Sequence, residues 1–280
     1  RRTGGYASAA CAVPDSLVGT GRSFSVVRLR ELDEAGFLVL PDFMSPQFLS
    51  RLRRQIDELF EFEADRAGSE FKQEPGCRRL ANLVDKGSVF QEILVEPRIL
   101  DFVSHVLGRQ FKLSSMNARS VNPAGSARQA LHADMNALPD GRGAWVCNTV
   151  WMLDDFTDDN GAIRAVPGSH RSGRLPQDVL PDPRAPHPDE VLVTGPAGTV
   201  IVMNAHLWHG GVENRSSRTR CAVHGFFCRD DKPQQQYQRQ WLSPSTQASL
   251  TAPMRKLLAL DDPMNDRLSV DVPVRSGFLK

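Results

Sequence analysis

The chain has few of the features that mark membrane, nucleic-acid-binding or disulfide-stabilised proteins. No apolar run approaches the ~20 residues that a membrane-spanning helix needs. The 34 basic and 33 acidic residues leave a formal net charge of +1. This charge gives no reason to expect nucleic acid or an anionic membrane surface as a partner. With 40% hydrophobic and 24% charged residues, the composition is that of an ordinary globular protein.

Cysteine is also scarce and is not arranged in pairs. The chain has an odd number of cysteines, scattered and without a C-x-x-C pair: Cys11, Cys77, Cys147, Cys221 and Cys228. A disulfide framework needs an even number at regular spacing, so this usage fits a reducing compartment better. We therefore expect a cytoplasmic protein.

The first 24 residues lack periodicity and are rich in Gly, Ser, Ala and Arg. A signal peptide needs an uninterrupted apolar stretch of about 7–15 residues, and Pro14 and Asp15 interrupt the candidate stretch. We expect residues 1–24 to be a flexible tail. A single domain is then expected over residues 25–280, with a helical part to about 110, a β-core over about 111–230 and a C-terminal extension over about 231–280.

The helical part begins with a short buried strand, predicted over Gly36 to Pro41. Ser45-Pro46 is typical of a helix N-cap followed by proline at the first helical position. Apolar residues at helical spacing predict a helix from Phe48 to Ala67. A second helix is predicted from Glu96 to Leu107, because Gly108 suits the position after a helix end.

From Phe111 onward, short β-type runs are separated by Gly, Pro, Asn and Asp. The predicted strands are residues 144–153, 162–166, 190–194, 199–203 and 220–228. Many short strands with turn residues between them are typical of an antiparallel sandwich or barrel. Residues 173–188, with five prolines, predict a long irregular loop that could serve as a lid. The fold class is thus mainly β, with helices packed outside one double-sheeted domain.

His132-Ala133-Asp134 is the strongest candidate for a metal site. Residues separated by one position share a face of a β-strand, so a histidine and a carboxylate would lie side by side. A remote histidine would complete a set of three ligands on one face of the ion, the arrangement of non-haem Fe(II) oxygenases. His209 follows Asp134 by 75 positions, and His206 lies three residues before it. Spacing alone leaves both histidines open.

Arg220 begins an apolar strand that runs to Phe227. A cation at this place is most often a solvated strand end. It can also be a bidentate partner for a carboxylate, because the guanidinium is planar. His224 shares the strand face of Arg220, so it is a candidate for lining the same cavity.

Three further blocks, in order along the chain, strengthen the candidate site. They are Gly36-Phe37-Leu38-Val39-Leu40-Pro41-Asp42-Phe43 before a helix, Asn160-Gly161-Ala162-Ile163-Arg164-Ala165-Val166-Pro167-Gly168-Ser169-His170, and His206-Leu207-Trp208-His209-Gly210-Gly211 with Asn214 and Arg220. With the H-x-D motif, they make residues 33–229 similar to the phytanoyl-CoA dioxygenase (PhyH-like) family of Fe(II)/2-oxoglutarate-dependent oxygenases.

The resemblance implies a double-stranded β-helix, the jelly-roll core of cupin-like proteins, with N-terminal helices outside. It makes His132 and Asp134 the proximal iron ligands, and it selects His209 over His206 as the distal one. Arg220, 11 residues beyond His209, matches the arginine that binds the C5 carboxylate of 2-oxoglutarate. Trp151 matches an aromatic position lining the co-substrate pocket. Arg79 or a neighbour matches a cation used by some members. Gly211 replaces a serine of one relative.

The implied reaction is hydroxylation of a C–H bond of a small molecule, with O₂ as oxidant and release of succinate and CO₂. Family substrates include acyl-CoA thioesters, free amino acids, osmolytes and natural-product intermediates. Related halogenases have a small residue where this chain has Asp134, so the resemblance favours a hydroxylase. The alternatives are a cupin-like metal enzyme that does not use 2-oxoglutarate and a non-catalytic binding protein. Neither nucleic acid nor a membrane is expected as a partner.

Overall fold

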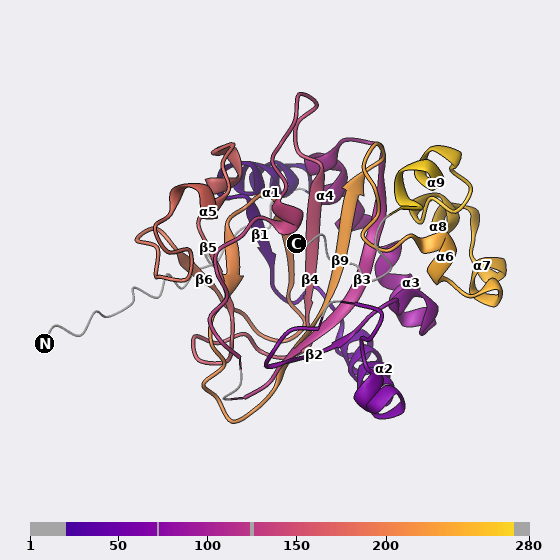
Figure 1. The fold of residues 1–280 in the computed structure, drawn as a ribbon, viewed down its shortest axis with the longest axis horizontal. Helices are drawn as coiled ribbons and strands as arrows, with labels where there is room; N and C mark the ends of the chain where they lie inside the picture. Colours follow the sequence, from indigo (N-terminus) through magenta and orange to yellow (C-terminus); the bar gives the residue numbers. More distant parts are fainter. Residues whose placement is uncertain (1–20, 72, 124–125, 272–280) are drawn as a thin grey trace, which may run out of the picture.

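Two antiparallel sheets form the centre of the molecule in a computed structural model, which describes residues 21–71, 73–123 and 126–271 (Figure 1). The six-stranded sheet has the order β1-β7-β4-β9-β3-β2, and the three-stranded sheet has the order β6-β5-β8. The strands are β1 (Phe37–Leu40), β2 (Cys77–Leu80), β3 (Phe111–Val121), β4 (Val146–Met152), β5 (Ile163–Ala165), β6 (Val191–Val193), β7 (Val200–Asn204), β8 (His209–Gly211) and β9 (Arg220–Arg229). Two antiparallel sheets with N-terminal helices confirm the predicted fold class.

Alternation along β4 separates two cores. Cys147 and Trp151 point from the large sheet toward the helices and join the main apolar core there. Val150 and Met152 point the other way and pack with residues of the small sheet in a second core. The same inner face continues across β9 to β3, where His224 lies opposite Asn117. Polar residues on this inner face therefore lie in the space between the two sheets.

Helices cover the outer face of the large sheet. They are α1 (Gly21–Ala35), α2 (Pro46–Glu63), α3 (Ser88–Leu94) and α4 (Pro97–Leu107). Apolar residues of α2, α3 and α4 pack into the main core, as the helical periodicity predicts. None of the described helices combines the length and the apolar character that crossing a bilayer requires.

The predicted start of α2 is confirmed and its predicted end is wrong. The Ser45 hydroxyl accepts a hydrogen bond from the Phe48 backbone N–H at 3.2 Å, and Pro46 is the first helical residue. The helix ends at Glu63 rather than Ala67, because Ala64 has a φ of 46° and cannot continue a right-handed helix. For α4 both ends agree with the prediction, and Gly108 has the positive φ, 83°, that favours glycine after a helix.

Short helices complete the chain. α5 (Pro176–Val179) lies within the proline-rich loop, while α6 (Gln238–Trp241), α7 (Pro244–Ser249), α8 (Ala252–Leu257) and α9 (Pro263–Ser269) follow β9. Figure 1 shows these last four gathered at one end of the molecule, to the right of β3. Of the predicted N-terminal tail, residues 1–20 lie outside the described residues, and α1 already begins at Gly21. The described cysteines, Cys77, Cys147, Cys221 and Cys228, are buried free thiols.

The proline-rich loop after Gly173 is attached to the small sheet by one arginine. The Arg164 side chain on β5 is fully buried and donates to the carbonyl oxygens of Gln129, Pro183 and Ala185 at 2.7–2.9 Å. It also pairs with Glu190 at 2.9 Å. These bonds join the loop to the segment that leads into His132. Between residues 183 and 190 the loop is therefore anchored to the small sheet, and a role as a lid stays a prediction for the part before it.

We expect Arg164→Met to lower the free energy of unfolding by about 3 kcal/mol or more, because three carbonyl groups and Glu190 lose a charged donor that is itself fully buried. Urea unfolding followed by circular dichroism measures this change. Arg184→Met is the matched control, since Arg184 lies exposed on the same loop. Equal unfolding midpoints for the two variants would contradict the anchoring role of Arg164.

Candidate functional site

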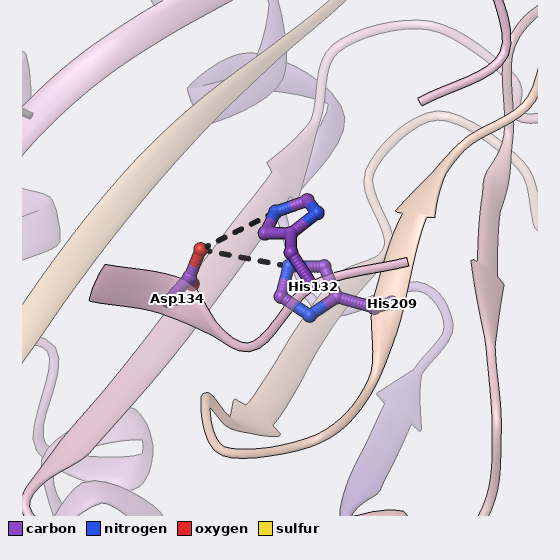
Figure 2. Close-up of side chains that lie close together, drawn as sticks. All are labelled: His132, Asp134 and His209. Carbon is purple, nitrogen blue, oxygen red and sulfur yellow. Dashed lines mark ion pairs between the residues drawn. The ribbon is translucent and has the colours of Figure 1, made fainter. Parts of the chain in front are cut away.

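Three side chains converge in the space between the two sheets (Figure 2). One ligand atom from each of His132, Asp134 and His209 lies within 4.8 Å of the others. The Asp134 Oδ1 atom is 3.8 Å from His132 Nε2 and 3.6 Å from His209 Nε2. In Figure 2 both imidazole rings are directed toward the carboxylate of Asp134. Two imidazoles and one carboxylate at such separations can hold a single metal ion on one face.

The backbone brings the two histidines together directly. His132 and His209 exchange N–H···O=C bonds of 2.9 and 3.0 Å, an isolated bridge at the edge of β8. The sequence predicts a strand through His132 and Asp134, and this prediction is wrong. Ala133 is extended, so the two ligands do project to one side. Asp134 then begins a 3₁₀ turn, in which Met135 has a φ of 59°.

Hydrogen bonds fix the orientation of each ligand. The Nδ1–H of His132 donates to the Ala130 carbonyl at 3.0 Å, and that of His209 donates to the Leu207 carbonyl at 2.8 Å. Each ring therefore presents Nε2 to the metal position. Burial, followed by the neighbouring His209, lowers the pKa of His132 and favours its neutral, metal-binding form.

Asp134 has a partner of its own. The Asn148 amide on β4 donates to Asp134 Oδ2 at 3.2 Å, which leaves Oδ1 directed at the two rings. Such a bond to the second oxygen holds the carboxylate in the orientation that a metal ligand needs.

His206, the alternative to His209, lies outside this cluster. Its Nε2 accepts a hydrogen bond from the Trp145 backbone N–H at 3.1 Å, and its Nδ1–H donates to the Ala137 carbonyl at 2.9 Å. Both ring nitrogens are thus bonded to backbone groups, and neither is available to a metal. The structure brings His209 to the cluster, in agreement with the resemblance.

Arg220 is a buried cation, not a solvated strand end. The residue is 2% exposed, its guanidinium lies 4.1 Å from the centre of the Phe156 ring, and it donates to the Gly161 carbonyl. Its Nε atom has no hydrogen-bond partner, and no carboxylate of the described residues forms an ion pair with the guanidinium. Burial is the main cause that lowers the pKa of Arg220, to about 9. An arginine left in this state suits an acidic ligand.

Trp151 does not lie near the cluster, so its prediction as a pocket-lining residue is wrong. It points to the helix-covered face of β4, opposite to Asn148, because residues three apart on a strand face opposite sides. Its ring packs edge-on against Phe43 and Phe48, with centroids 5.6 and 6.3 Å apart. The indole N–H donates to Thr149 Oγ1 at 3.2 Å. Trp151 is therefore part of the main core.

Arg79 does face the space between the sheets. It lies on β2 directly opposite Arg119 of β3, so both side chains share the inner face. Its guanidinium donates to Glu74 Oε2 at 2.7 Å, and its Nε atom is buried without a partner.

Four residues of this region were not among the candidates from the sequence. Glu74 accepts hydrogen bonds from Arg79, Arg119 and Gln129, and Gln129 Oε1 accepts from the Gly211 N–H at 2.7 Å. The Phe156 ring packs against the Arg220 guanidinium. Arg119 could have been found from the alternation on β3. Glu74, in a turn, gives no comparable signal in the sequence.

Gly211 stands where the resemblance suggests a missing serine contact, and the structure gives its neighbours. A Cβ atom added at this position would lie 3.1 Å from Gln129 Oε1. The neighbouring Gly210 would bring a Cβ to 3.1 Å from the Ala130 carbonyl oxygen. The two glycines thus allow the segment before His132 to approach β8 closely.

Comparison with known proteins places these observations in context. The family model described as phytanoyl-CoA dioxygenase (PhyH) matches residues 32–222. The dioxygenase af480 of Aspergillus fumigatus is 28% identical over 193 residues, which cover 66% of this chain and 60% of that protein, less than two thirds of its length. The L-proline trans-4-hydroxylase of Streptomyces griseoviridis is 25% identical over 221 residues, covering 67% of this chain and 80% of that protein.

Solved structures share the fold at lower identity. HygX from Streptomyces hygroscopicus, with nickel and 2-oxoglutarate bound, has a TM-score of 0.58 and 18% identity over 74% of this chain and 88% of its own. The carbocyclase SnoK from nogalamycin biosynthesis has a TM-score of 0.59 and 20% identity over 73% of this chain and 84% of its own.

Proposed function

The chain belongs to the phytanoyl-CoA dioxygenase family of Fe(II)- and 2-oxoglutarate-dependent oxygenases, and we propose that it hydroxylates a C–H bond of a small molecule. One observation carries the proposal. A facial set of two histidines and one carboxylate shares the inner face of the sheets with a buried arginine that pairs with no carboxylate of the described residues. A cupin-like metal enzyme without 2-oxoglutarate would give this arginine no role. A non-catalytic binding protein would be favoured by the loss of a metal ligand, and all three ligands are present.

His132, Asp134 and His209 would hold the iron through the two Nε2 atoms and Oδ1. Because all three lie on one side of the ion, the other side stays open for small ligands. When bound, the iron supplies with O₂ and 2-oxoglutarate the oxidising power for the C–H bond, releasing succinate and CO₂. The protein holds the substrate carbon in position and excludes water from it.

Arg220 would bind the C5 carboxylate of 2-oxoglutarate. Its planar guanidinium can donate two parallel hydrogen bonds, and burial strengthens the attraction by removing competing water. Phe156 covers one face of the guanidinium and so leaves its edge for the ligand. Arg79 would supply a second cation to the same ligand from β2, which agrees with its inward direction.

Asp134 supports hydroxylation over halogenation. The carboxylate occupies the place that a halogenase leaves to chloride, and Asn148 holds it toward the metal position. The similarity to a proline hydroxylase agrees with this choice. A carbocyclase and an epimerase share the fold at 20% identity or below, so the fold by itself does not select the outcome.

The test is turnover of 2-oxoglutarate by the iron-loaded protein. We expect release of labelled CO₂ from 2-oxoglutarate labelled at C1, with one succinate formed for each CO₂. A panel of acyl-CoA thioesters, free amino acids and osmolytes is screened for a product heavier by one oxygen atom, with chloride present. A chlorinated product would contradict the hydroxylase assignment. Absence of both turnover and calorimetric binding of 2-oxoglutarate would contradict the whole proposal.

A further inference from the structure

Three donors from separate segments converge on the carboxylate of Glu74. Arg79 on β2 donates to Oε2 at 2.7 Å. Arg119 on β3 donates to both oxygens, at 3.1 Å from Nε and 2.8 Å from Nη2. Gln129, three residues before His132, donates from its amide to Oε1. Two guanidiniums and an amide arranged around one carboxylate form a built carboxylate-binding site, which Glu74 fills from within the chain.

This carboxylate-binding site adjoins the metal centre. Gln129 Oε1 accepts a hydrogen bond from the backbone of Gly211, two residues after the ligand His209. A Cβ atom at Gly211 would lie 3.8 Å from Arg119 Nη1, so this guanidinium reaches the backbone of β8. The donors around Glu74 are therefore within the same inner space as the metal ligands.

Positive charge is in excess in this space. Arg79, Arg119 and Arg220 all project from the inner face, and Glu74 is the carboxylate that pairs with the first two. His224 lies among them with a buried, unpartnered Nε2. Burial and the three arginine charges hold the pKa of His224 well below its usual value. In the absence of an anionic ligand, Glu74 supplies the negative charge that keeps Arg79 and Arg119 side by side.

The position of Glu74 in the chain allows it to leave. It lies in the turn between the short 3₁₀ helix Ala64–Arg66 and β2, whereas Arg79 and Arg119 are held by paired strands. Moving the Glu74 side chain breaks no strand pairing. Burial alone would raise the pKa of Glu74, but hydrogen bonds and charges of Arg119 and Arg79 outweigh it and lower the pKa to about 2. Glu74 is therefore ionised at neutral pH, as a competitor for a carboxylate must be.

We propose that Glu74 is an internal competitor of 2-oxoglutarate: its carboxylate occupies Arg79, and binding of the co-substrate displaces it. The inference rests on the proposed function, in which Arg79 serves the co-substrate. Before displacement, Arg79 is bonded to the protein itself, so only the fraction of molecules with Glu74 turned away can bind. The apparent dissociation constant is raised by the inverse of that fraction. The device lowers co-substrate affinity without altering Arg220 or the metal ligands.

The test is calorimetric titration of 2-oxoglutarate into nickel-loaded protein, in which affinity is measured without turnover. Minor conformations of proteins are commonly populated at about 10% or less. We therefore expect Glu74→Gln to bind 2-oxoglutarate roughly 10-fold more tightly than the wild type. Glu70→Gln is the matched control, because Glu70 lies in the same connection before β2 and pairs with Lys86 at 2.7 Å. It is expected to bind as the wild type does.

A second measurement separates displacement from a structural role. Hydrogen exchange of the amides of Gln73, Glu74, Gly76 and Cys77 is expected to rise when 2-oxoglutarate is added to the wild type, because the Glu74 contacts are broken. Unchanged or weaker binding by Glu74→Gln would overturn the inference, since Glu74 would then support the arginines. If neither the wild type nor Glu74→Gln binds 2-oxoglutarate, the proposed function fails as well. If the wild type binds 2-oxoglutarate tightly and its hydrogen exchange does not change, displacement of Glu74 is overturned and the proposed function stands.

Discussion

The His209→Ala variant is expected to lose metal-dependent turnover of 2-oxoglutarate. The loss should exceed the ~100-fold that accompanies removal of a hydrogen-bond partner of a ligand. His209 Nε2 lies 3.6 Å from the carboxylate of Asp134, and without it two ligands remain on the metal. Metal content after dialysis against iron-containing buffer, together with CO₂ release, measures the effect.

His206→Gln is the matched control for this variant. His206 lies three residues before His209, but both of its ring nitrogens bind backbone groups. Glutamine can accept and donate at the same place, so metal content and turnover should stay near the wild-type values. If His206→Gln lost the metal and His209→Ala kept it, the distal ligand would be His206 and the assignment to His209 would be wrong.

The Arg220→Met variant is expected to change affinity and stability in opposite directions. Loss of the partner of a buried carboxylate costs about 2–5 kcal/mol, which corresponds to a fall of ~30-fold or more in 2-oxoglutarate affinity. Metal binding should remain, because Arg220 contacts none of the three ligands in the described hydrogen bonds. Calorimetry on the nickel-loaded protein measures both affinities.

The metal-free Arg220→Met protein is expected to be more stable than the wild type, by about 1–2 kcal/mol. Methionine fills a similar volume and removes a buried charge that no carboxylate in the described part of the chain neutralises. Arg164→Met provides the comparison, since that arginine is equally buried but pairs with Glu190 and donates to three carbonyl oxygens, so its loss should destabilise the fold. Urea unfolding of the two variants should give shifts of opposite sign. A destabilised Arg220→Met protein with unchanged co-substrate affinity would make Arg220 a structural residue.

Local patterns predicted most of the fold. The Ser45-Pro46 cap, the end of α4 at Gly108 and the strands β4, β5, β6, β7 and β9 depend on residues close together in the chain. Cap and turn chemistry act within a few residues, so the sequence carries them directly. The end of α2 was missed because alanine, unlike glycine or asparagine, does not signal a positive φ, and Ala64 has one.

The candidate site was predicted in part, for a related reason. The H-x-D spacing correctly placed two ligands on one side, because Ala133 is extended. The expected strand does not continue, since a turn begins at Asp134. Trp151 was assigned to the wrong face, because a family match fixes a position along the chain and not the direction of a side chain. Glu74, Arg119 and Gln129 meet across 45 to 55 residues of chain. Such contacts depend on the pairing of the strands, which composition and periodicity do not specify.

Because His132 and His209 are joined by a backbone bridge, a bound metal would also affect the stability of the fold. The ion would join the Asp134 turn to β8, elements that are distant in sequence and bonded in space by two backbone hydrogen bonds. A ligand that binds only the folded state stabilises it by about 2.7 kcal/mol at a free concentration 100 times its dissociation constant. Iron supply would thus influence how long the chain survives in a cell as well as how fast it works. Molecules that lack the metal would open more often and be the first that proteases degrade.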